Sequence, residues 1–314
     1  RICQNIAGLS DEKMMLPSSM QVLERGWLSS NNIVFIGADQ TAIVDTGYAS
    51  HAQQTLELVQ QLLKGRKLDT IYNTHLHSDH CGGNKILQDH YAVRTVVPAA
   101  EMVKVQQWDR TVLSFQATGQ ACERFTAEGV MHAGEQLRLG DLDWHVLAAP
   151  GHDPHSVVLY CEQERILISA DALWEKGFGV IFPELDGRPG FKETRATLEM
   201  IGELDVRLVI PGHGAPFTDF SKALDIAHSR LDYLQADPLR NAQNAVKVLL
   251  KFLLLDRKKI LLSDVPRLLS EIPLVSAANT YYIGYGTIHL AHWAITQLRR
   301  SGAVQVEGNY LLDC

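Results

Sequence analysis

The chain has 314 residues, of which 46% are hydrophobic and 21% charged, a composition typical of a globular protein. Its 29 Lys and Arg against 36 Asp and Glu give a formal net charge of −7, which argues against nucleic acid as a partner. No apolar run has the length that a transmembrane helix needs, so no membrane association is expected.

Five cysteines are spread along the chain without any short spacing: Cys3, Cys81, Cys122, Cys161 and Cys314. An odd number in a chain of this length does not suggest a disulfide framework. It fits a reducing compartment better, and no secretory signal is visible in the sequence. We therefore expect a cytoplasmic location.

The first two thirds of the chain alternate short apolar runs, which predict strands, with runs of helical apolar spacing. The predicted strands are Ile33–Ile36, Ala42–Val44, Leu68–Tyr72, Thr95–Val97, Leu137–Leu139, Trp144–Ala148, Val157–Tyr160, Ile166–Ser169 and Arg207–Ile210. The predicted helices are Ala52–Leu63, Ile86–Asp89 and Lys192–Leu204. Residues 100–129 interrupt this rhythm and are interpreted as a lid or a helical insertion. The alternation predicts an α/β protein with helix-covered sheets.

The last third is mainly helical. Helical spacing covers Lys222–Ala236, Ala242–Leu255, Val265–Glu271 and Ile288–Arg300, and the end of the chain predicts a hairpin around Glu307–Asn309. Helices followed by a terminal hairpin indicate a small winged-helix-like domain. We expect a catalytic domain at 1–220 and this helical domain at 221–314.

One short run carries most of the chemical information. His75, His77, Asp79 and His80 place three imidazoles and a carboxylate within six residues, directly after a predicted strand. Histidines two residues apart in a loop can point at one ion, while Asp79 and His80 leave at another angle and can reach a second ion. A metal site is the interpretation that accounts for all four donors.

Three further donors follow predicted strands, where active sites of layered α/β proteins gather. They are His152 in Pro150-Gly151-His152, Asp171, and His213 in Pro211-Gly212-His213-Gly214. Glycine beside histidine lets the backbone turn sharply. Each motif alone is weak, since a Pro-Gly-His sequence is more often a turn than a ligand.

Taken in order, these motifs resemble those of the metallo-β-lactamase superfamily over roughly residues 20–220, and the matching residues are Asp45, His75, His77, Asp79, His80, His152, Asp171 and His213. The resemblance implies an αββα sandwich with a two-metal site between its sheets. In that pattern one metal is held by His75, His77 and His152, and the other by Asp79, His80 and His213. Asp171 bridges both metals, and Asp45 supports the histidine loop.

The resemblance also narrows the branch of the superfamily. The bridging Asp171 is similar to the site of glyoxalase II rather than to that of enzymes that hydrolyse β-lactams. Di-iron redox members carry Glu where this chain has His77, so redox chemistry is not expected. Members that end in a winged-helix-like domain include hydrolases that act on RNA. For the C-terminal domain of this chain we expect packing against the metal domain, or homodimerisation, rather than DNA binding.

The sequence after His152 departs from the family. It reads Asp153-Pro154-His155-Ser156, where the family often has Thr-x-Gly-Ser or Thr-x-Gly-His. Asp153 and His155 are expected to brace the loop through hydrogen bonds beside the metal ligand. Contact with the substrate or its leaving group is the alternative.

The combined prediction is a hydrolase that uses two divalent metal ions. Imidazole and carboxylate donors without thiolate favour zinc, with iron or manganese as alternatives. A hydroxide between two metals would attack the substrate, and Asp79 or Asp171 would orient it and move a proton. The expected small-molecule substrate is an ester, thioester or lactone, and the alternative activity is that of a phosphodiesterase or ribonuclease.

Five aromatic residues are expected to line an apolar pocket or, alternatively, to belong to the core: Trp108, Phe115, Trp174, Phe178 and Phe182.

Overall fold

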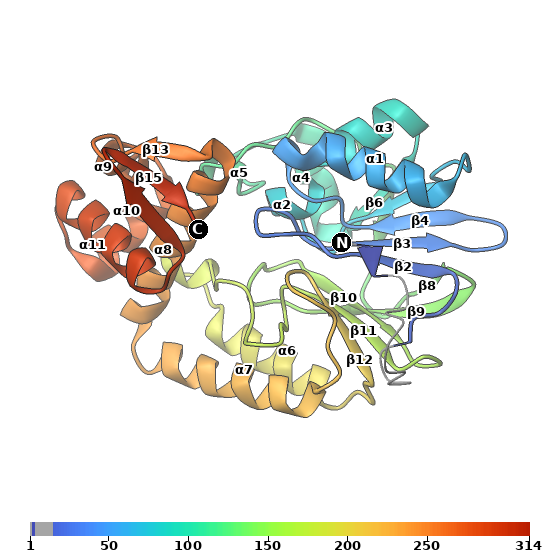
Figure 1. Ribbon diagram of the computed structural model, residues 1–314. Helices are drawn as coiled ribbons and strands as arrows, with labels where there is room; N and C mark the ends of the chain where they lie inside the picture. The colour runs from blue at the N-terminus through green and yellow to red at the C-terminus, as the bar shows by residue number, and fades with distance from the viewer. Residues whose placement is uncertain (1, 4–14) are drawn as a thin grey trace.

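Two β-sheets face each other at the centre of the computed structural model, which describes residues 2–3 and 15–314 (Figure 1). The first sheet runs in the order β1-β2-β3-β4-β5-β6-β7, and the second in the order β12-β11-β10-β9-β8. The strands of the first sheet are β1 (Ile2–Cys3), β2 (Met20–Leu23), β3 (Asn32–Ile36), β4 (Thr41–Val44), β5 (Thr70–Tyr72), β6 (Arg94–Pro98) and β7 (Gly129–Met131). Those of the second are β8 (Gln136–Leu139), β9 (Leu142–Ala148), β10 (Val157–Cys161), β11 (Ile166–Ala170) and β12 (Leu208–Pro211).

Strand alternation divides the apolar side chains between an inner core and two outer ones. In β3, Ile33 and Phe35 enter the core between the sheets, whereas Val34 faces the helices. In β10, Leu159 lies in the same inner core and Val158 faces the opposite helical layer. Both faces of these strands are therefore buried, which explains why their sequences are continuous apolar runs.

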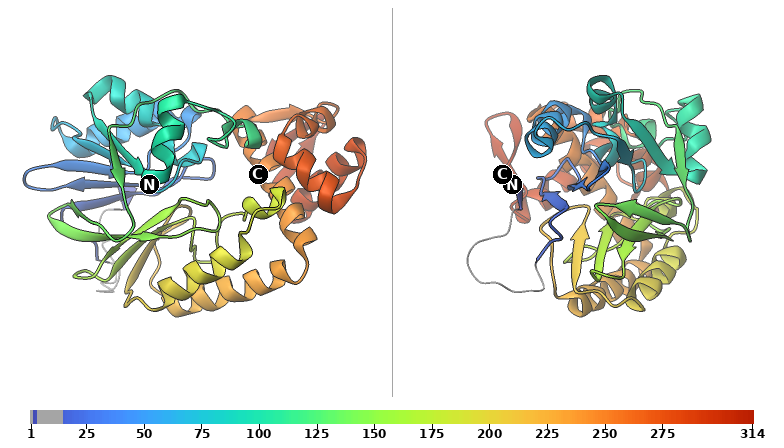
Figure 2. Two further views of the ribbon diagram at one scale, coloured as in Figure 1. Left: turned by 180° about the vertical axis from the view of Figure 1, so that it is seen from behind. Right: turned by 90° about the vertical axis from the view of Figure 1, so that its right-hand side faces the viewer.

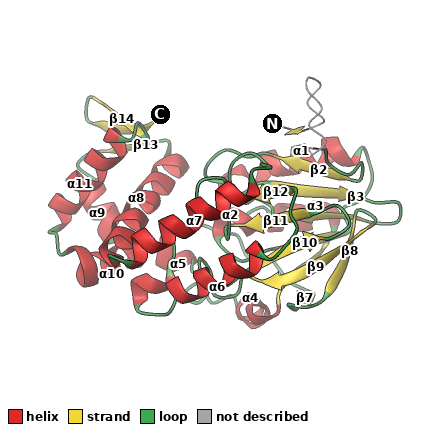
Figure 3. Cartoon of the chain, turned by 90° about the horizontal axis from the view of Figure 1, so that it is seen from below, coloured by secondary structure: helices red, strands yellow, loops and turns green. Residues whose placement is uncertain are grey.

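Helices cover the outer face of each sheet (Figures 1 and 2). Helices α1 (Ala52–Leu63) and α3 (Asn84–Tyr91) pack on the first sheet, and α6 (Phe191–Gly202) and α7 (Phe220–Gln235) pack on the second. The layers therefore form the expected αββα sandwich. Figure 3 shows α6 and α7 lying across the second sheet.

Helix α7 belongs to the sandwich rather than to the C-terminal unit. Its buried residues Ala223, Ala227 and Leu231 share a core with Leu198 and Ile201 of α6. We therefore propose that the boundary lies near Asp237, between α7 and α8 (Pro238–Arg257), and not at residue 220.

The C-terminal unit has its own apolar core and a three-stranded sheet of order β13-β15-β14. Its further elements are β13 (Lys259–Leu261), α9 (Val265–Ser270), α10 (Pro273–Ala278), the π-helix η5 (Asn279–Ile283), α11 (Thr287–Arg300), β14 (Val304–Glu307) and β15 (Tyr310–Asp313). Helices followed by a β14–β15 hairpin give the winged-helix-like arrangement that the sequence predicts.

The insertion at 100–129 contains the two short helices α4 (Met102–Gln107) and α5 (Phe115–Thr118). In the described part of the chain, none of the helices is both long and apolar enough to span a bilayer. The four cysteines whose side chains are described are free thiols, as the sequence predicts for them, and the side chain of Cys3 lies outside the described residues.

The inner core predicts a large effect of one tryptophan on stability. Trp144 is fully buried, packs edge-on against Phe35 at a centroid distance of 5.4 Å, and donates a hydrogen bond to the Leu139 carbonyl. Trp144→Ala is expected to lower the free energy of unfolding by about 3–5 kcal/mol, because it leaves a cavity between the sheets. Urea unfolding followed by far-UV circular dichroism measures this loss. Tyr281→Ala is the control, since that side chain is 73% exposed and should change stability by no more than about 0.5 kcal/mol. Equal effects of the two substitutions would contradict the packing described.

Candidate metal centre

All the donors that the sequence singles out stand just beyond the ends of strands, on one edge of the sandwich. His75 and His77 follow β5, and the short helix α2 (Ser78–Cys81) begins directly after His77. His152 follows β9, Asp171 follows β11 and His213 follows β12. The parallel pairing of β4 with β5 and of β11 with β12 brings these loops to the same edge.

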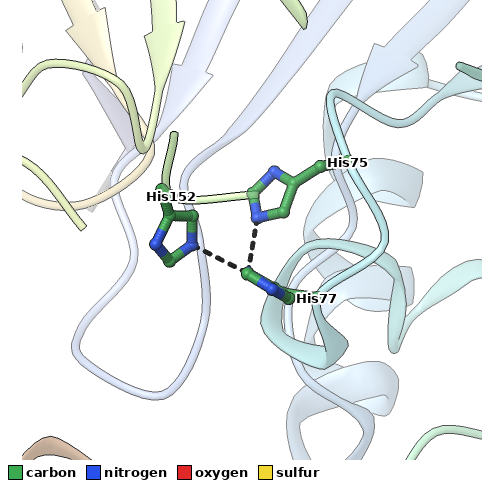
Figure 4. Close-up of side chains that lie close together, drawn as sticks. All are labelled: His75, His77 and His152. Atoms are coloured by element: carbon green, nitrogen blue, oxygen red, sulfur yellow. Dashed lines mark hydrogen bonds between the residues drawn. The ribbon is translucent and has the colours of Figure 1, made fainter. Parts of the chain in front are cut away.

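Three histidines form the first cluster, which Figure 4 shows. The Nε2 atom of His75 lies 3.0 Å from Nδ1 of His77, and that atom lies 2.7 Å from Nε2 of His152. The opposite nitrogens of two rings have other partners: Nδ1 of His152 donates to the Val180 carbonyl at 2.5 Å, and Nδ1 of His75 lies 3.1 Å from the Thr74 hydroxyl. The unprotonated nitrogens of these two rings therefore face the cluster.

Burial and neighbouring imidazoles keep His75 and His77 of this cluster neutral. Burial, together with His80 and His77, holds the pKa of His75 well below its usual range. Burial and the adjacent His152 lower the pKa of His77 to about 4. Neutral imidazole is the form of histidine that binds metal ions, so the site is prepared for a cation.

Asp79, His80, Asp171 and His213 form the second cluster, in which one ligand atom of each residue lies within 4.8 Å of those of the others. Nε2 of His213 is 3.1 Å from Oδ2 of Asp79, and Nε2 of His80 is 3.4 Å from Oδ1 of Asp171. Nε2 of His80 is buried and has no hydrogen-bond partner among the described residues. A buried polar atom without a partner is costly, and a bound cation would provide that partner.

Asp45 orients His80 of the second cluster through a hydrogen bond to the ring nitrogen that faces away from the cluster. Its Oδ2 accepts two hydrogen bonds, one from Nδ1 of His80 and one from the Thr74 hydroxyl, each at 2.7 Å. Its Oδ1 accepts a hydrogen bond from the Thr74 amide at 2.9 Å. The hydrogen bond from Nδ1 to Asp45 directs Nε2 of His80 toward the cluster, where it would bind a metal ion. Asp45 adopts a positive φ of 56°, which turns its carboxylate back toward the histidine loop.

Asp171, a member of the second cluster, also reaches the first. Its Oδ2 is 3.2 Å from Nε2 of His152, whereas its Oδ1 is 3.4 Å from Nε2 of His80 and 3.7 Å from Nε2 of His213. Burial alone would raise the pKa of Asp171, but the surrounding imidazoles outweigh it and hold that pKa well below its usual range. The carboxylate is therefore ionised and has one oxygen toward each cluster.

Gly212 permits this approach. A Cβ atom added at Gly212 would lie 2.2 Å from Oδ1 of Asp171, so no larger residue fits while Asp171 keeps its place. This explains physically why Pro211-Gly212-His213 has glycine before its histidine. The carboxylate-and-imidazole donors of the two clusters fit two divalent ions such as zinc or iron.

The segment from Arg25 to Asn32, which no sequence motif marks, holds the loops that carry Asp79 and His213. The amide of Ser30 donates to the Asp79 carbonyl at 2.9 Å, and the side-chain amide of Asn31 donates to the carbonyls of Pro211 and Gly214. Trp27 stacks on His213 at a centroid distance of 5.7 Å. Nothing in the local sequence signals these roles, because they arise from contacts more than 40 residues away along the chain.

A cavity of about 260 Å³ opens beside the second cluster. Trp174, Phe178 and Phe182 line it, as expected, and α8 of the C-terminal unit adds Val248 and Phe252. The side chains of Leu28, Trp27 and Asn244 also reach it.

Trp108 and Phe115 correct the pocket prediction, since neither lines this cavity. Phe115 is fully buried, and Trp108 packs against Phe115 and Phe125. The insertion uses these aromatic residues to pack on the first-sheet layer, in a core that also contains Leu76 and Val97.

A second, more polar cavity of about 410 Å³ adjoins the first cluster and shares His77, His152 and Phe182 with the apolar one. Asp153 lies there, with Oδ2 3.8 Å from Nε2 of His77, and its Oδ1 accepts the amide of His155 at 2.8 Å. The His155 ring faces Glu101, 3.9 Å away, rather than either cluster. Of the two residues, Asp153 is therefore the one placed to orient a candidate metal ligand, His77.

The sequence matches the family described as the metallo-beta-lactamase superfamily over residues 25–213. It is 27% identical over 209 residues to the hydroxyacylglutathione hydrolase of Brucella anthropi, an alignment that covers 64% of this chain and 67% of that enzyme. The hydroxyacylglutathione hydrolase of Brucella ovis is 26% identical, and the chain spans only 54% of its length. A metallo-beta-lactamase family protein from Thermus thermophilus has a similar fold over 96% of this chain and 100% of its own, with a TM-score of 0.58 and 21% identity.

The Asp45 contacts predict a defect in metal affinity. Asp45→Asn removes the charge that orients His80 and is expected to weaken metal binding at the second cluster by about 10–100-fold. Chelator competition titrations with zinc, together with the metal content after dialysis, measure the change. Asp39→Asn, in the exposed turn between β3 and β4, removes the same charge without touching either cluster and should bind zinc as the unchanged chain does. Identical affinities for the two variants would contradict the orienting role of Asp45.

Proposed function

Because the chain belongs to the metallo-beta-lactamase superfamily, we propose that it is a two-metal hydrolase of a small ester, thioester or lactone, with a thioester as the favoured substrate. The observation that carries the proposal is the position of Asp171 between two complete donor clusters at the end of an apolar cavity. The relatives named hydroxyacylglutathione hydrolases support the thioester, since an acyl group on the glutathione sulfur is a thioester.

We assign the donors as the clusters group them. His75, His77 and His152 would hold one ion, and Asp79, His80 and His213 the other, with Asp171 contributing one oxygen to each. Zinc is the proposed ion, and iron or manganese are the alternatives. Two bound divalent ions would supply a water of lowered pKa and a Lewis acid for the carbonyl oxygen.

The chain itself positions the substrate and moves the proton. Oδ2 of Asp79 lies 3.1 Å from Nε2 of His213, so this carboxylate stands where it would orient the attacking water and take its proton. The aromatic side chains of Trp174 and Phe182 exclude bulk water from the apolar cavity and hold the acyl group against the clusters. The leaving group would occupy the polar cavity beside Asp153 and His155.

Phosphodiester hydrolysis is the second candidate, and one surface favours it. A groove next to the apolar cavity is lined by Lys247, Lys251 and Arg300, although the chain as a whole is acidic. Lys251 is paired with Asp313, which reduces the charge that this groove offers to phosphates. An acyl substrate therefore remains the preferred proposal.

A substrate panel tests the proposal and compares its two classes. The zinc-loaded chain is expected to hydrolyse p-nitrophenyl esters and acyl thioesters, and to leave bis-p-nitrophenyl phosphate and short RNA intact. Asp171→Asn should lower kcat/KM by about 10²–10⁴-fold, because it removes the one carboxylate shared by both clusters. Asp143→Asn is the charge-matched control on β9, where the carboxylate pairs with Arg138 and lines neither cavity. Cleavage of phosphodiesters alone would overturn the acyl assignment.

Metal removal gives an independent prediction. Dialysis against a chelator should abolish hydrolysis, and added zinc should restore it, because imidazole and carboxylate donors alone cannot lower the pKa of water enough for attack. The far-UV circular dichroism spectrum should be retained, since both sheets pack on apolar cores that do not include the donors. Full activity of the metal-free chain would contradict a metal-dependent mechanism.

A further inference from the structure

Arg230 is a cation at the wall of the apolar cavity. It comes from α7, and its guanidinium carbon lies 5.5 Å from the centroid of the Phe178 ring. Among the described residues, no carboxylate lies close enough to form an ion pair with it, and burial lowers its pKa with no opposing carboxylate. By contrast, Arg195 and Arg240 are paired with Asp232 and Asp237.

The loop that follows Asp171 is shaped around this side chain. Gly177 has a φ of 126°, and a Cβ atom there would lie 2.8 Å from Cδ of Arg230. The same glycine exchanges backbone hydrogen bonds with Trp174, whose indole contacts Asp171 and His213. The guanidinium is therefore placed by the same loop that lines the metal side of the cavity.

The rest of the cavity lining contrasts with the positive charge of Arg230. Apart from histidines, Arg230 is the one basic side chain among the described residues that line the cavity, and Phe178, Phe182, Val248 and Leu249 give the same cavity an apolar lining. The pKa of Lys247 is lowered by burial and by Arg230, so the two cations repel each other. A half-buried guanidinium in such surroundings interacts strongly with an anion that enters the cavity.

We propose that Arg230 binds a carboxylate carried by the acyl group, so that the preferred substrates are thioesters or esters of dicarboxylic acids with an apolar spacer. This inference rests on the proposed hydrolase function. The planar fork of a guanidinium matches the two oxygens of a carboxylate, and a single such group with few other donors suits a carboxylate better than a phosphate. The spacer would lie along Phe178 and Phe182, between Arg230 and the metal clusters.

Two acyl chains of equal length test the proposal. The zinc-loaded chain is assayed with the hexanoyl and adipoyl thioesters of N-acetylcysteamine, which differ only in the terminal carboxylate. The expected ratio of kcat/KM, adipoyl over hexanoyl, is at least about 10. Arg230→Met should bring this ratio to about 1, chiefly through a higher KM for the adipoyl substrate, and Arg230→Lys should retain an intermediate ratio. Circular dichroism confirms that each variant is folded.

Arg240→Met is the matched control. Arg240 also lies over an aromatic ring, that of Tyr233 at 3.9 Å, but it does not line the cavity, so the ratio should stay at its original value. A hexanoyl thioester of 3-mercaptopropionate moves the carboxylate to the leaving group, and dependence on Arg230 for this substrate alone would overturn the acyl assignment.

The remaining outcomes distinguish a failure of the role proposed for Arg230 from a failure of the proposed hydrolase function. Hydrolysis of both acyl thioesters with equal kcat/KM, or an equal loss of both on Arg230→Met, would overturn the role of Arg230 and leave the hydrolase intact. Failure of the unchanged, zinc-loaded chain to hydrolyse either thioester or p-nitrophenyl esters would overturn the proposed function, and the inference with it.

Discussion

The position of one carboxylate, Asp171, between two sets of buried imidazoles is the constraint on which the rest of the site depends. Its two oxygens lie 3.2 Å from His152 and 3.4 Å from His80. Such close approach requires glycine at position 212, where a Cβ atom would collide with the carboxylate. Buried imidazoles and carboxylates are costly unless they are paired or bind a cation. The arrangement is therefore intelligible as a preformed site for two divalent ions.

The sandwich supplies this arrangement because its strands end at one edge. Because apolar side chains are buried on both faces of the strands, the strand ends are fixed, and the loops that follow them are held close together. Asp45 then links the end of β4 to the histidine loop after β5, and Asn31 links the end of β12 to the segment before β3. Local sequence determines which residues stand at each strand end, and the sheets bring those ends together.

This division explains what the sequence could and could not predict. Nine strands of the sandwich could be predicted from their apolar runs, whereas β2, β7 and β13 were not. The αββα class and the grouping of donors could be predicted because the ordered motifs resemble those of a known family. The metal roles of those donors remain a prediction, supported by the geometry. Trp27 and Arg230 could not be found, since their positions depend on packing between distant segments. Trp108 and Phe115 could not be placed from the sequence, because an aromatic residue in an insertion can belong either to a pocket or to a core; both belong to a core.

The cavity joins the two units of the chain. Its metal side comes from the sandwich, and its far wall includes Val248 and Phe252 of α8. The C-terminal unit therefore contributes to the wall of the cavity beside the metal clusters. The central claim, a two-metal centre bridged by Asp171, is tested most directly by the anomalous scattering of zinc in crystals of the loaded protein. Two peaks are predicted, one among His75, His77 and His152 and one among Asp79, His80 and His213, with Asp171 between them. A single peak, or zinc bound away from these residues, would contradict the account.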